Sequence, residues 1–201
     1  MKNLLFFDTE TTGLIKYTEY GRANLEDPSQ PRVCALAASL TDHEGNIIDE
    51  MDVLIKPEGW VIEPGAAAVN GLTLERLEAE GITSRAALER FNELKAQCKT
   101  RIAANVSFDK QMMYIEAHRN GMPHDSEGLE QLCVLELATP YAKVPYAGGK
   151  KGYKRPKLTE AYKAIIGEDM PKAHTAMGDV RACQAIYFAI MQRLRAVEGV
   201  A

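Results

Sequence analysis

The sequence predicts an α/β fold in which a mixed sheet is flanked by helices. Short apolar runs typical of buried strands occur at residues 3–8, 33–41 and 47–56, before any helical pattern begins. Helix-spaced and strand-like segments then alternate along the rest of the chain, in the order β-β-β-α-β-α-β-α-α. This order favours a five-stranded sheet whose later strands are added through helical crossovers.

The first half of the chain carries clear turn signals between its strands. Thr11, Thr12 and Gly13 predict a turn after the first strand. Residues 15–32 are polar and contain glycine and proline, so we expect an inserted loop there, beside the entrance to any site at the end of the first strand. Residues 42–46 predict a hairpin connection between the second and third strands.

The second half predicts helices at residues 74–80 and 84–99, with Ser84 as a plausible N-cap. A short strand at residues 102–106 is expected next, followed by a helix through residues 112–116 that Gly121 and Pro123 end. Residues 132–137 predict another strand. Residues 157–166 and 177–194 predict the two last helices.

Composition limits the possible classes of protein. The 201 residues are 46% hydrophobic, enough for a substantial core, and the net charge of −4 argues against a protein that coats nucleic acid by bulk charge. The four cysteines show no Cys-x-x-Cys spacing, so we expect buried thiols, with no zinc site and no disulfide framework. No apolar run reaches the ~18 residues of a membrane span, which favours a soluble, cytoplasmic protein with no membrane partner.

Four carboxylates carry the strongest functional signal. Asp8 and Glu10 stand one residue apart where the first strand ends, so both project to one side of it. Asp109 follows the predicted strand at 102–106, and the carboxyl ends of such strands meet at one rim of a sheet. Asp179 lies in the last helix. Four converging carboxylates repel one another unless divalent cations neutralise them, which indicates a two-metal nuclease site.

The residues around these acids form three ordered motifs. Phe7-Asp8-Thr9-Glu10-Thr11-Thr12-Gly13-Leu14, then Asn105-x-x-Phe108-Asp109, then His174-x-Ala176-x-x-Asp179 resemble the exonuclease motifs of the DEDDh (DnaQ-like) 3′–5′ exonuclease superfamily. That superfamily includes the proofreading subunit of bacterial DNA polymerase III, oligoribonuclease and ribonuclease T. The resemblance extends from residue 5 to about residue 191, and the ordered triple is far more specific than any one motif.

The resemblance implies a ribonuclease H-like fold, with residues 1–201 as a single exonuclease domain. It implies release of nucleoside 5′-monophosphates from the 3′ end of single-stranded or frayed nucleic acid, with DNA favoured over RNA. His174 would be the general base, because it stands five residues before Asp179, whereas the sister subclass has tyrosine where Thr175 stands. The ligands of two Mg²⁺ or Mn²⁺ ions would be Asp8, Glu10, Asp109 and Asp179.

The resemblance also implies contacts to the substrate. Thr12 would contact the terminal nucleotide through its backbone, Leu14 would wedge against its base and Phe108 would pack beneath it. Thr11 and Asn105 complete this expected set. Asn70 and Ala104 stand where many relatives carry histidine, but neither position holds metal in the resemblance.

One stretch of the chain is densely basic. It contains Lys150, Lys151, Lys154, Arg155 and Lys157, interleaved with Tyr153, and we name it the basic segment. A flexible, solvated loop and an arm that tracks phosphates are equally good interpretations. In the second, Tyr146 or Tyr153 would stack on bases.

Each motif residue also has a simpler interpretation. Asp8 and Glu10 could be a solvated strand end, Asp109 a helix N-cap and Asp179 a surface residue. The protein could then be a non-catalytic module that binds nucleic acid or a polymerase subunit, or forms a homodimer. Because all four acids and His174 are present, the enzyme is favoured. The other histidines lack acidic partners at ligand spacing and have no expected role: His43, His118 and His124.

Overall fold

The computed structural model describes residues 3–21, 23–123, 128–171 and 174–199. Its centre is a five-stranded sheet with the order β3-β2-β1-β4-β5. Neighbouring strands are antiparallel from β1 to β3 and parallel from β1 through β4 to β5, so the mixed α/β sheet is confirmed. The strands are β1 (Asn3–Thr11), β2 (Val33–Thr41), β3 (Ile47–Leu54), β4 (Cys98–Ala103) and β5 (Glu130–Cys133).

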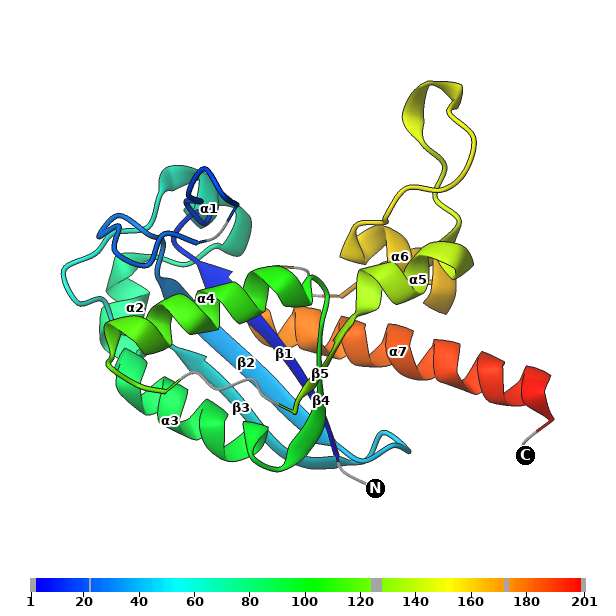
Figure 1. Cartoon of the computed structure of the whole chain (residues 1–201), viewed down its shortest axis with the longest axis horizontal. Coiled ribbons are helices and arrows are strands. Elements are labelled where there is room, and N and C mark those ends of the chain that lie inside the picture. The colour runs from blue at the N-terminus through cyan, green and yellow to red at the C-terminus, as the bar shows by residue number, and fades with distance from the viewer. Residues whose placement is uncertain (1–2, 22, 124–127, 172–173, 200–201) are drawn as a thin grey trace.

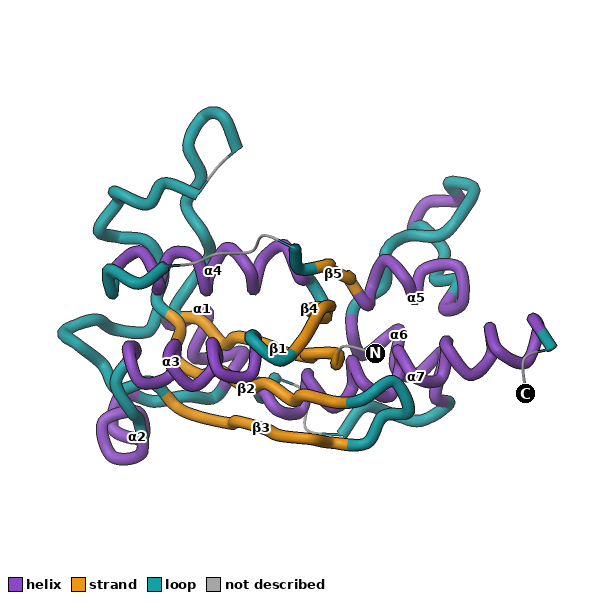
Figure 2. The backbone as a smooth tube through the Cα atoms, turned by 60° about the horizontal axis from the view of Figure 1, so that its bottom comes forward, coloured by secondary structure: helices purple, strands orange, loops and turns teal. Residues whose placement is uncertain are grey.

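Helices cover both faces of this sheet (Figure 1). Helices α3 and α4 pack on one face and α7 packs on the other, beside α5 and α6 (Figures 1 and 2). The helices are α1 (Pro64–Asn70), α2 (Leu74–Glu80), α3 (Ser84–Lys95), α4 (Val106–Arg119), α5 (Val134–Ala142), α6 (Leu158–Ile166) and α7 (Ala176–Glu198), with a short 3₁₀ turn at Ala147–Gly149.

Strand β1 alternates between two hydrophobic cores. Leu5 and Phe7 are buried in the core under α3 and α4, whereas Leu4 and Phe6 are buried in the core under α7. Because side chains alternate along a strand, Asp8 continues the α7 side. The central strand thereby aims its acidic end at the first turn of α7.

Several boundaries differ from the sequence prediction. The strand predicted at 3–8 continues to Thr11, and the helix predicted at 84–99 ends at Lys95, because Cys98 already belongs to β4. The strand predicted at 102–106 is therefore four residues too late. Ser84 is not the N-cap of α3. Thr83 takes that position, while the hydroxyl of Ser84 is buried and donates to Glu116 Oε2 at 3.1 Å.

Two helices were not predicted. The apolar run at 132–137 was predicted as a strand, but β5 ends at Cys133 and α5 begins at Val134. Short apolar runs fit either structure, and here packing against α6 and α7 favours the helix. Helix α1 is a single short stretch of small residues with no periodic signal. Helix α4 starts at Val106, earlier than the predicted residue 112.

None of the four cysteines, all of which lie in the described part of the chain, forms a disulfide bond, and three of them are buried. In the described part of the chain, no helix is both long and apolar enough to cross a membrane. His124 lies outside the described residues.

Candidate active site

Three of the four predicted metal ligands form one cluster. Asp8 and Glu10 come from the carboxyl end of β1 and Asp179 from the first turn of α7. One carboxylate oxygen from each of the three lies within 4.8 Å of the others. The alternation of β1 and the packing of α7 on that face together produce this convergence.

The first turn of α7 is built to hold Asp179 in place. Thr175 is the N-cap, and its hydroxyl accepts from the backbone N–H of Gly178 at 3.2 Å. The backbone N–H of His174 donates to Asp179 Oδ1 at 3.2 Å. His174 is exposed and has a φ of 65°, a left-handed conformation that few non-glycine residues adopt. The imidazole therefore stands at the rim of the cluster, on a backbone tied to one of its ligands.

Asp109 reaches the site from the opposite face of the sheet. It lies in the first turn of α4, and its Oδ1 accepts from the backbone N–H of Thr9 at 3.0 Å and from the Thr9 hydroxyl at 2.8 Å. Asn105 is the N-cap of α4, so the N-cap interpretation of Asp109 is wrong. The charge of Asp109 acts on both Asp8 and Glu10.

The pKa values of the four carboxylates are raised, as expected for acidic groups that lie close together without bound cations. Burial raises the pKa of Asp8 well above its usual range, and the charges of Asp109, Asp179 and Glu10 raise it further. Burial and the neighbouring aspartates raise the pKa of Glu10 to about 7. Burial also raises the pKa of Asp109 to about 7, against the lowering effect of the Thr9 hydrogen bonds. The pKa of Asp179 is raised by burial too. A positive charge would relieve all four groups.

Two pockets flank Glu10 and Asn70. The first has a volume of about 360 Å³ and is lined by Thr11, Gly13 and Leu14 on one side and by α1 on the other. The second, of about 430 Å³, is lined by His174 and the start of α7. Glu10 and Asn70 line both. Glu10, one member of the acidic cluster, thus stands between the two pockets.

The other residues that were predicted to contact the substrate differ in their solvent exposure. Leu14 is 79% exposed, Asn105 is exposed and Phe108 is half-buried against the core. Thr12 is buried, and its N–H donates to the carbonyl of Arg32 at 2.9 Å while its own carbonyl accepts from Glu63. Thr12 therefore shapes the turn after β1, and its backbone groups are already engaged within the protein.

The basic segment is more ordered than either sequence interpretation assumed. Lys154 pairs with Glu160 Oε2 at 2.7 Å, and Lys150 lies 4.6 Å from the ring centroid of Tyr146. Arg155 donates from Nη2 to Asn105 Oδ1 at 3.0 Å. Lys151 is exposed. The segment stands out from the body next to α5 and α6 (Figure 1).

Sequence reasoning missed two residues that build this site. Thr9 fixes Asp109, and Asn70 donates from Nδ2 to the carbonyl of Thr11 at 3.4 Å while its Oδ1 accepts from the N–H of Leu72. The position of Thr9 between the two acids was the available signal, because strand alternation places it on the side from which Asp109 arrives.

Comparison with known families agrees with this geometry. The sequence profile of the exonuclease family (RNase T type) matches residues 5–187, which is nearly the whole chain. The chain belongs to this exonuclease family. The resemblance to the DEDDh superfamily is thereby confirmed, and the ribonuclease H-like fold with it.

Individual relatives extend the comparison. The chain is 29% identical over 200 residues to exodeoxyribonuclease I of Escherichia coli strain K12, covering 90% of this chain and 38% of the relative. It is similar to solved structures of E. coli exonuclease I in a zinc-bound complex with single-stranded DNA (TM-score 0.75) and in a complex with a dA16 oligonucleotide (TM-score 0.76). Both structures are 25% identical, and the alignments cover 96% of this chain and 41% of theirs. The chain spans about two fifths of the length of these relatives.

Proposed function

We propose that this protein is a metal-dependent 3′–5′ exonuclease that removes nucleoside 5′-monophosphates from the end of single-stranded DNA. The observation that carries the proposal is the convergence of Asp8, Glu10 and Asp179 within 4.8 Å beside His174. Family membership supports the class of reaction. The similar structures of E. coli exonuclease I are complexes with single-stranded DNA and with a dA16 oligonucleotide, which supports DNA over RNA as the substrate.

The donor set fits hard divalent cations. Only carboxylate oxygens converge in the cluster, and Mg²⁺ and Mn²⁺ prefer such ligands. Asp8, Glu10 and Asp179 would hold the ions, and Asp109 would add a carboxylate oxygen from the α4 side. When bound, such ions neutralise the carboxylates and stabilise the negative charge that develops on the phosphate.

The chain's own residues supply the proton transfer and the positioning. A water oxygen attacks the phosphorus of the last phosphodiester, and His174 accepts the proton that this water loses. The bond between phosphorus and the 3′ oxygen of the penultimate nucleotide breaks, and that oxygen leaves with the shortened strand. The exposed position of His174 leaves its imidazole free to return the proton to solvent.

The pocket of about 360 Å³ is the proposed place of the terminal nucleotide. It touches Glu10, so a nucleotide bound there has its phosphate next to the acidic cluster. Leu14 and Val69 supply apolar surface, which every base can contact. Phe108 and Asn105 would border the same nucleotide from the start of α4. We therefore expect little preference for the identity of the terminal base.

A labelled single strand tests the proposal directly. A 5′-labelled oligodeoxynucleotide incubated with the protein and Mg²⁺ or Mn²⁺ should shorten stepwise from its 3′ end, and EDTA should stop the shortening. A matched RNA strand should be degraded more slowly. Internal cuts without a ladder, or a ladder that EDTA leaves unchanged, would contradict the proposal.

The alternative is a non-catalytic module that binds nucleic acid. A module of this kind has no need for the acids, whereas this chain keeps all four, with His174 at the rim of the cluster. Binding of the labelled strand without any shortening in either metal would favour the module.

A further inference from the structure

The described residues of the loop, 15–21 and 23–32, are held together by one buried side chain. Gln30 is 3% exposed. Its Oε1 accepts from the backbone N–H of Lys16 at 2.9 Å, and its Nε2 donates to the carbonyl of Asn24 at 2.8 Å. Main-chain groups from two parts of the loop are therefore hydrogen-bonded to the same side-chain amide. These hydrogen bonds stabilise the loop in the absence of a hydrophobic core of its own.

This loop is also fixed relative to the acidic cluster. Arg119 of α4 donates to the carbonyls of Pro31 and Gln30, each at 2.7 Å. Thr12, two residues after Glu10, bonds through its N–H to the carbonyl of Arg32 at 2.9 Å. The carboxyl end of the loop is thus tied both to α4 and to the turn that follows Glu10.

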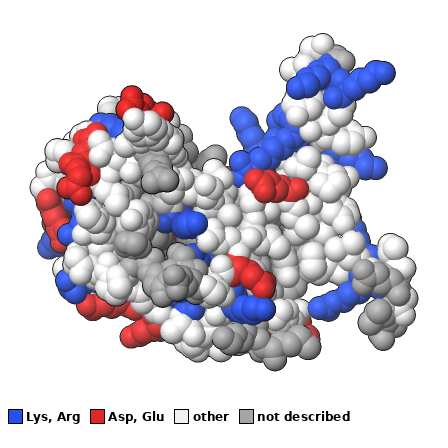
Figure 3. Space-filling model, in the orientation of Figure 1, with Lys and Arg blue, Asp and Glu red and all other residues white. Residues whose placement is uncertain are grey.

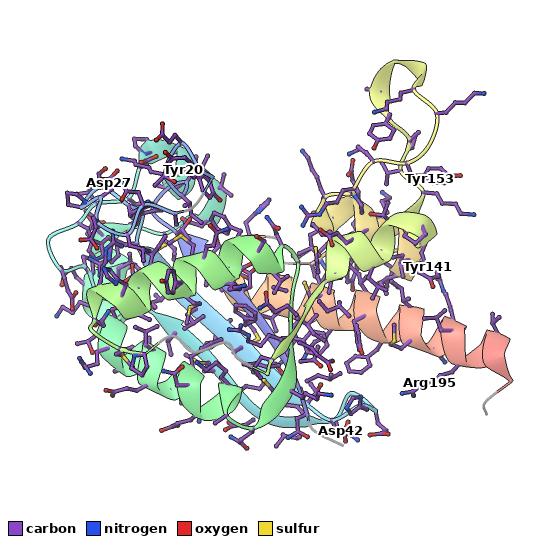
Figure 4. The ribbon with its side chains drawn as sticks, viewed as in Figure 1. Tyr20, Asp27, Asp42, Tyr141, Tyr153 and Arg195 are labelled. Atoms are coloured by element: carbon purple, nitrogen blue, oxygen red, sulfur yellow. The ribbon has the colours of Figure 1, made fainter. Side chains whose placement is uncertain are left out.

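The tip displays two tyrosines. Tyr17 forms an isolated antiparallel bridge with Ala23, and the N–H of Gly21 donates to the carbonyl of Thr18 at 2.9 Å. This turn leaves Tyr20 82% exposed and Tyr17 52% exposed. Leu14, at the base of the loop, lines the proposed nucleotide pocket. In Figure 4, Tyr20 lies near the top of the lobe that the loop forms with α1.

The two walls of the site differ in charge. Figure 3 shows this face hollowed between the lobe of the loop and α1 and the lobe of α5, α6 and the basic segment, with lysine and arginine side chains on the second lobe. The loop displays Glu19 and Glu26 in exposed positions together with Lys16, so its charges are mixed. Phosphates of a bound strand are attracted to the basic lobe. A strand held there by its phosphates can turn its bases toward the tyrosines of the loop.

We propose that Tyr17 and Tyr20 form a second base-stacking subsite, which holds nucleotides upstream of the 3′-terminal one in a single strand. The placement of the 3′ end in this inference rests on the proposed function. Tyrosine suits such a subsite, because it offers a large flat surface and only two side-chain torsions to restrict. Stacking on an aromatic ring is tolerant of sequence, as a subsite for successive bases requires.

Binding without cleavage tests this subsite. A 12-residue oligothymidylate carrying one 2-aminopurine base, placed in turn at each of the six positions next to the 3′ end, is titrated with protein in EDTA. Fluorescence should be quenched at one or more upstream positions. Tyr20→Ala should remove that quenching and weaken binding by roughly 5- to 100-fold, whereas Tyr20→Phe should retain both.

Val197→Ala is the matched control, because Val197 is equally exposed but lies at the far end of α7. It should change neither quenching nor affinity. A dinucleotide is too short to reach the loop, so its affinity should be the same in all variants. Unchanged upstream quenching in Tyr20→Ala and Tyr17→Ala would overturn the subsite. Because EDTA prevents cleavage, this outcome is independent of whether the protein degrades DNA.

Discussion

His174 is the residue at which proton transfer can be separated from metal binding. Its imidazole is exposed, whereas its backbone N–H is bonded to Asp179 Oδ1. Substitution of the side chain removes the proton acceptor and leaves that backbone bond available. The two functions of this part of the site can therefore be measured apart.

We expect His174→Ala to lower the rate of single-strand degradation by about 10²- to 10⁴-fold, the range that general-base catalysis supplies. The affinity for Mn²⁺, measured by calorimetry, should change little. His43→Ala, at the β2–β3 hairpin, is the control and should retain full activity. A rate of His174→Ala within a few-fold of the unmodified protein would exclude this residue as the base.

Arg155, in the basic segment, is expected to act on the substrate through Asn105 rather than by contacting the strand itself. Its Nη2 donates to Asn105 Oδ1 at 3.0 Å, which leaves the amide NH₂ of Asn105 free to donate to the substrate. Arg155→Gln and Asn105→Ala should each raise KM for DNA more than they lower kcat. The double variant should be no worse than the poorer single one. Additive effects would show instead that Arg155 contacts the strand independently.

At the scale of elements, helix α4 joins the loop to the catalytic strand. Glu116 lies two turns after Asp109 and is 1% exposed. Its carboxylate accepts from Arg32 Nε at 2.8 Å and from the backbone N–H of Val33 at 3.1 Å. Asp109 holds β1 in the same way, through Thr9. One helix thus positions both the start of β2 and the end of β1.

Glu116→Gln should destabilise the fold, because the partly buried guanidinium groups of Arg32 and Arg119 lose the charge of the carboxylate that they share. We expect a loss of about 1.5–3 kcal/mol in the free energy of unfolding, measured by urea denaturation. Glu26→Gln, which affects only an exposed pair with His118, should cost about 0–1 kcal/mol. Equal stabilities of the two variants would contradict the proposed role of Glu116.

The elements that sequence alone predicts well are those with a complete local signal. Residues 33–41 and 74–80 were predicted to the residue, since a continuous apolar run and a capped amphipathic turn define them. Helix α5 was missed because its identity depends on packing against α6 and α7. Of the candidate site, the sequence predicts that Asp8, Glu10, Asp109, Asp179 and His174 meet at one rim of the sheet. The hydrogen bonds from Thr9 that hold Asp109 depend on how α4 packs against β1, which no local pattern shows.

At the scale of the whole molecule, folding concentrates negative charge at one rim of the sheet. Burial and mutual repulsion raise the pKa of Glu10 and that of Asp109 to about 7, whereas both groups titrate near ~4 in an unfolded chain. Between these values the metal-free folded state binds protons that the unfolded state releases. Stability of the metal-free protein must therefore fall as pH rises from about 4 to about 7.

Thermal denaturation in EDTA should show this dependence. The melting temperature of the metal-free protein should be lower at a pH of about 8 than at about 6, and Mg²⁺ should raise it more at the higher pH. Glu10→Gln should reduce the dependence, because it removes one of the titrating groups. A metal-free melting temperature that does not change over this range would contradict the account of the cluster.

The central claim is that the acids at the end of β1 and the start of α7 hold paired cations. Calorimetric titration of the metal-free protein with Mn²⁺ tests it most directly. The account predicts saturable binding of two ions per chain, abolished or reduced to one by Asp8→Ala, which removes one carboxylate of the cluster. No saturable binding, or binding that Asp8→Ala leaves unchanged, would contradict it.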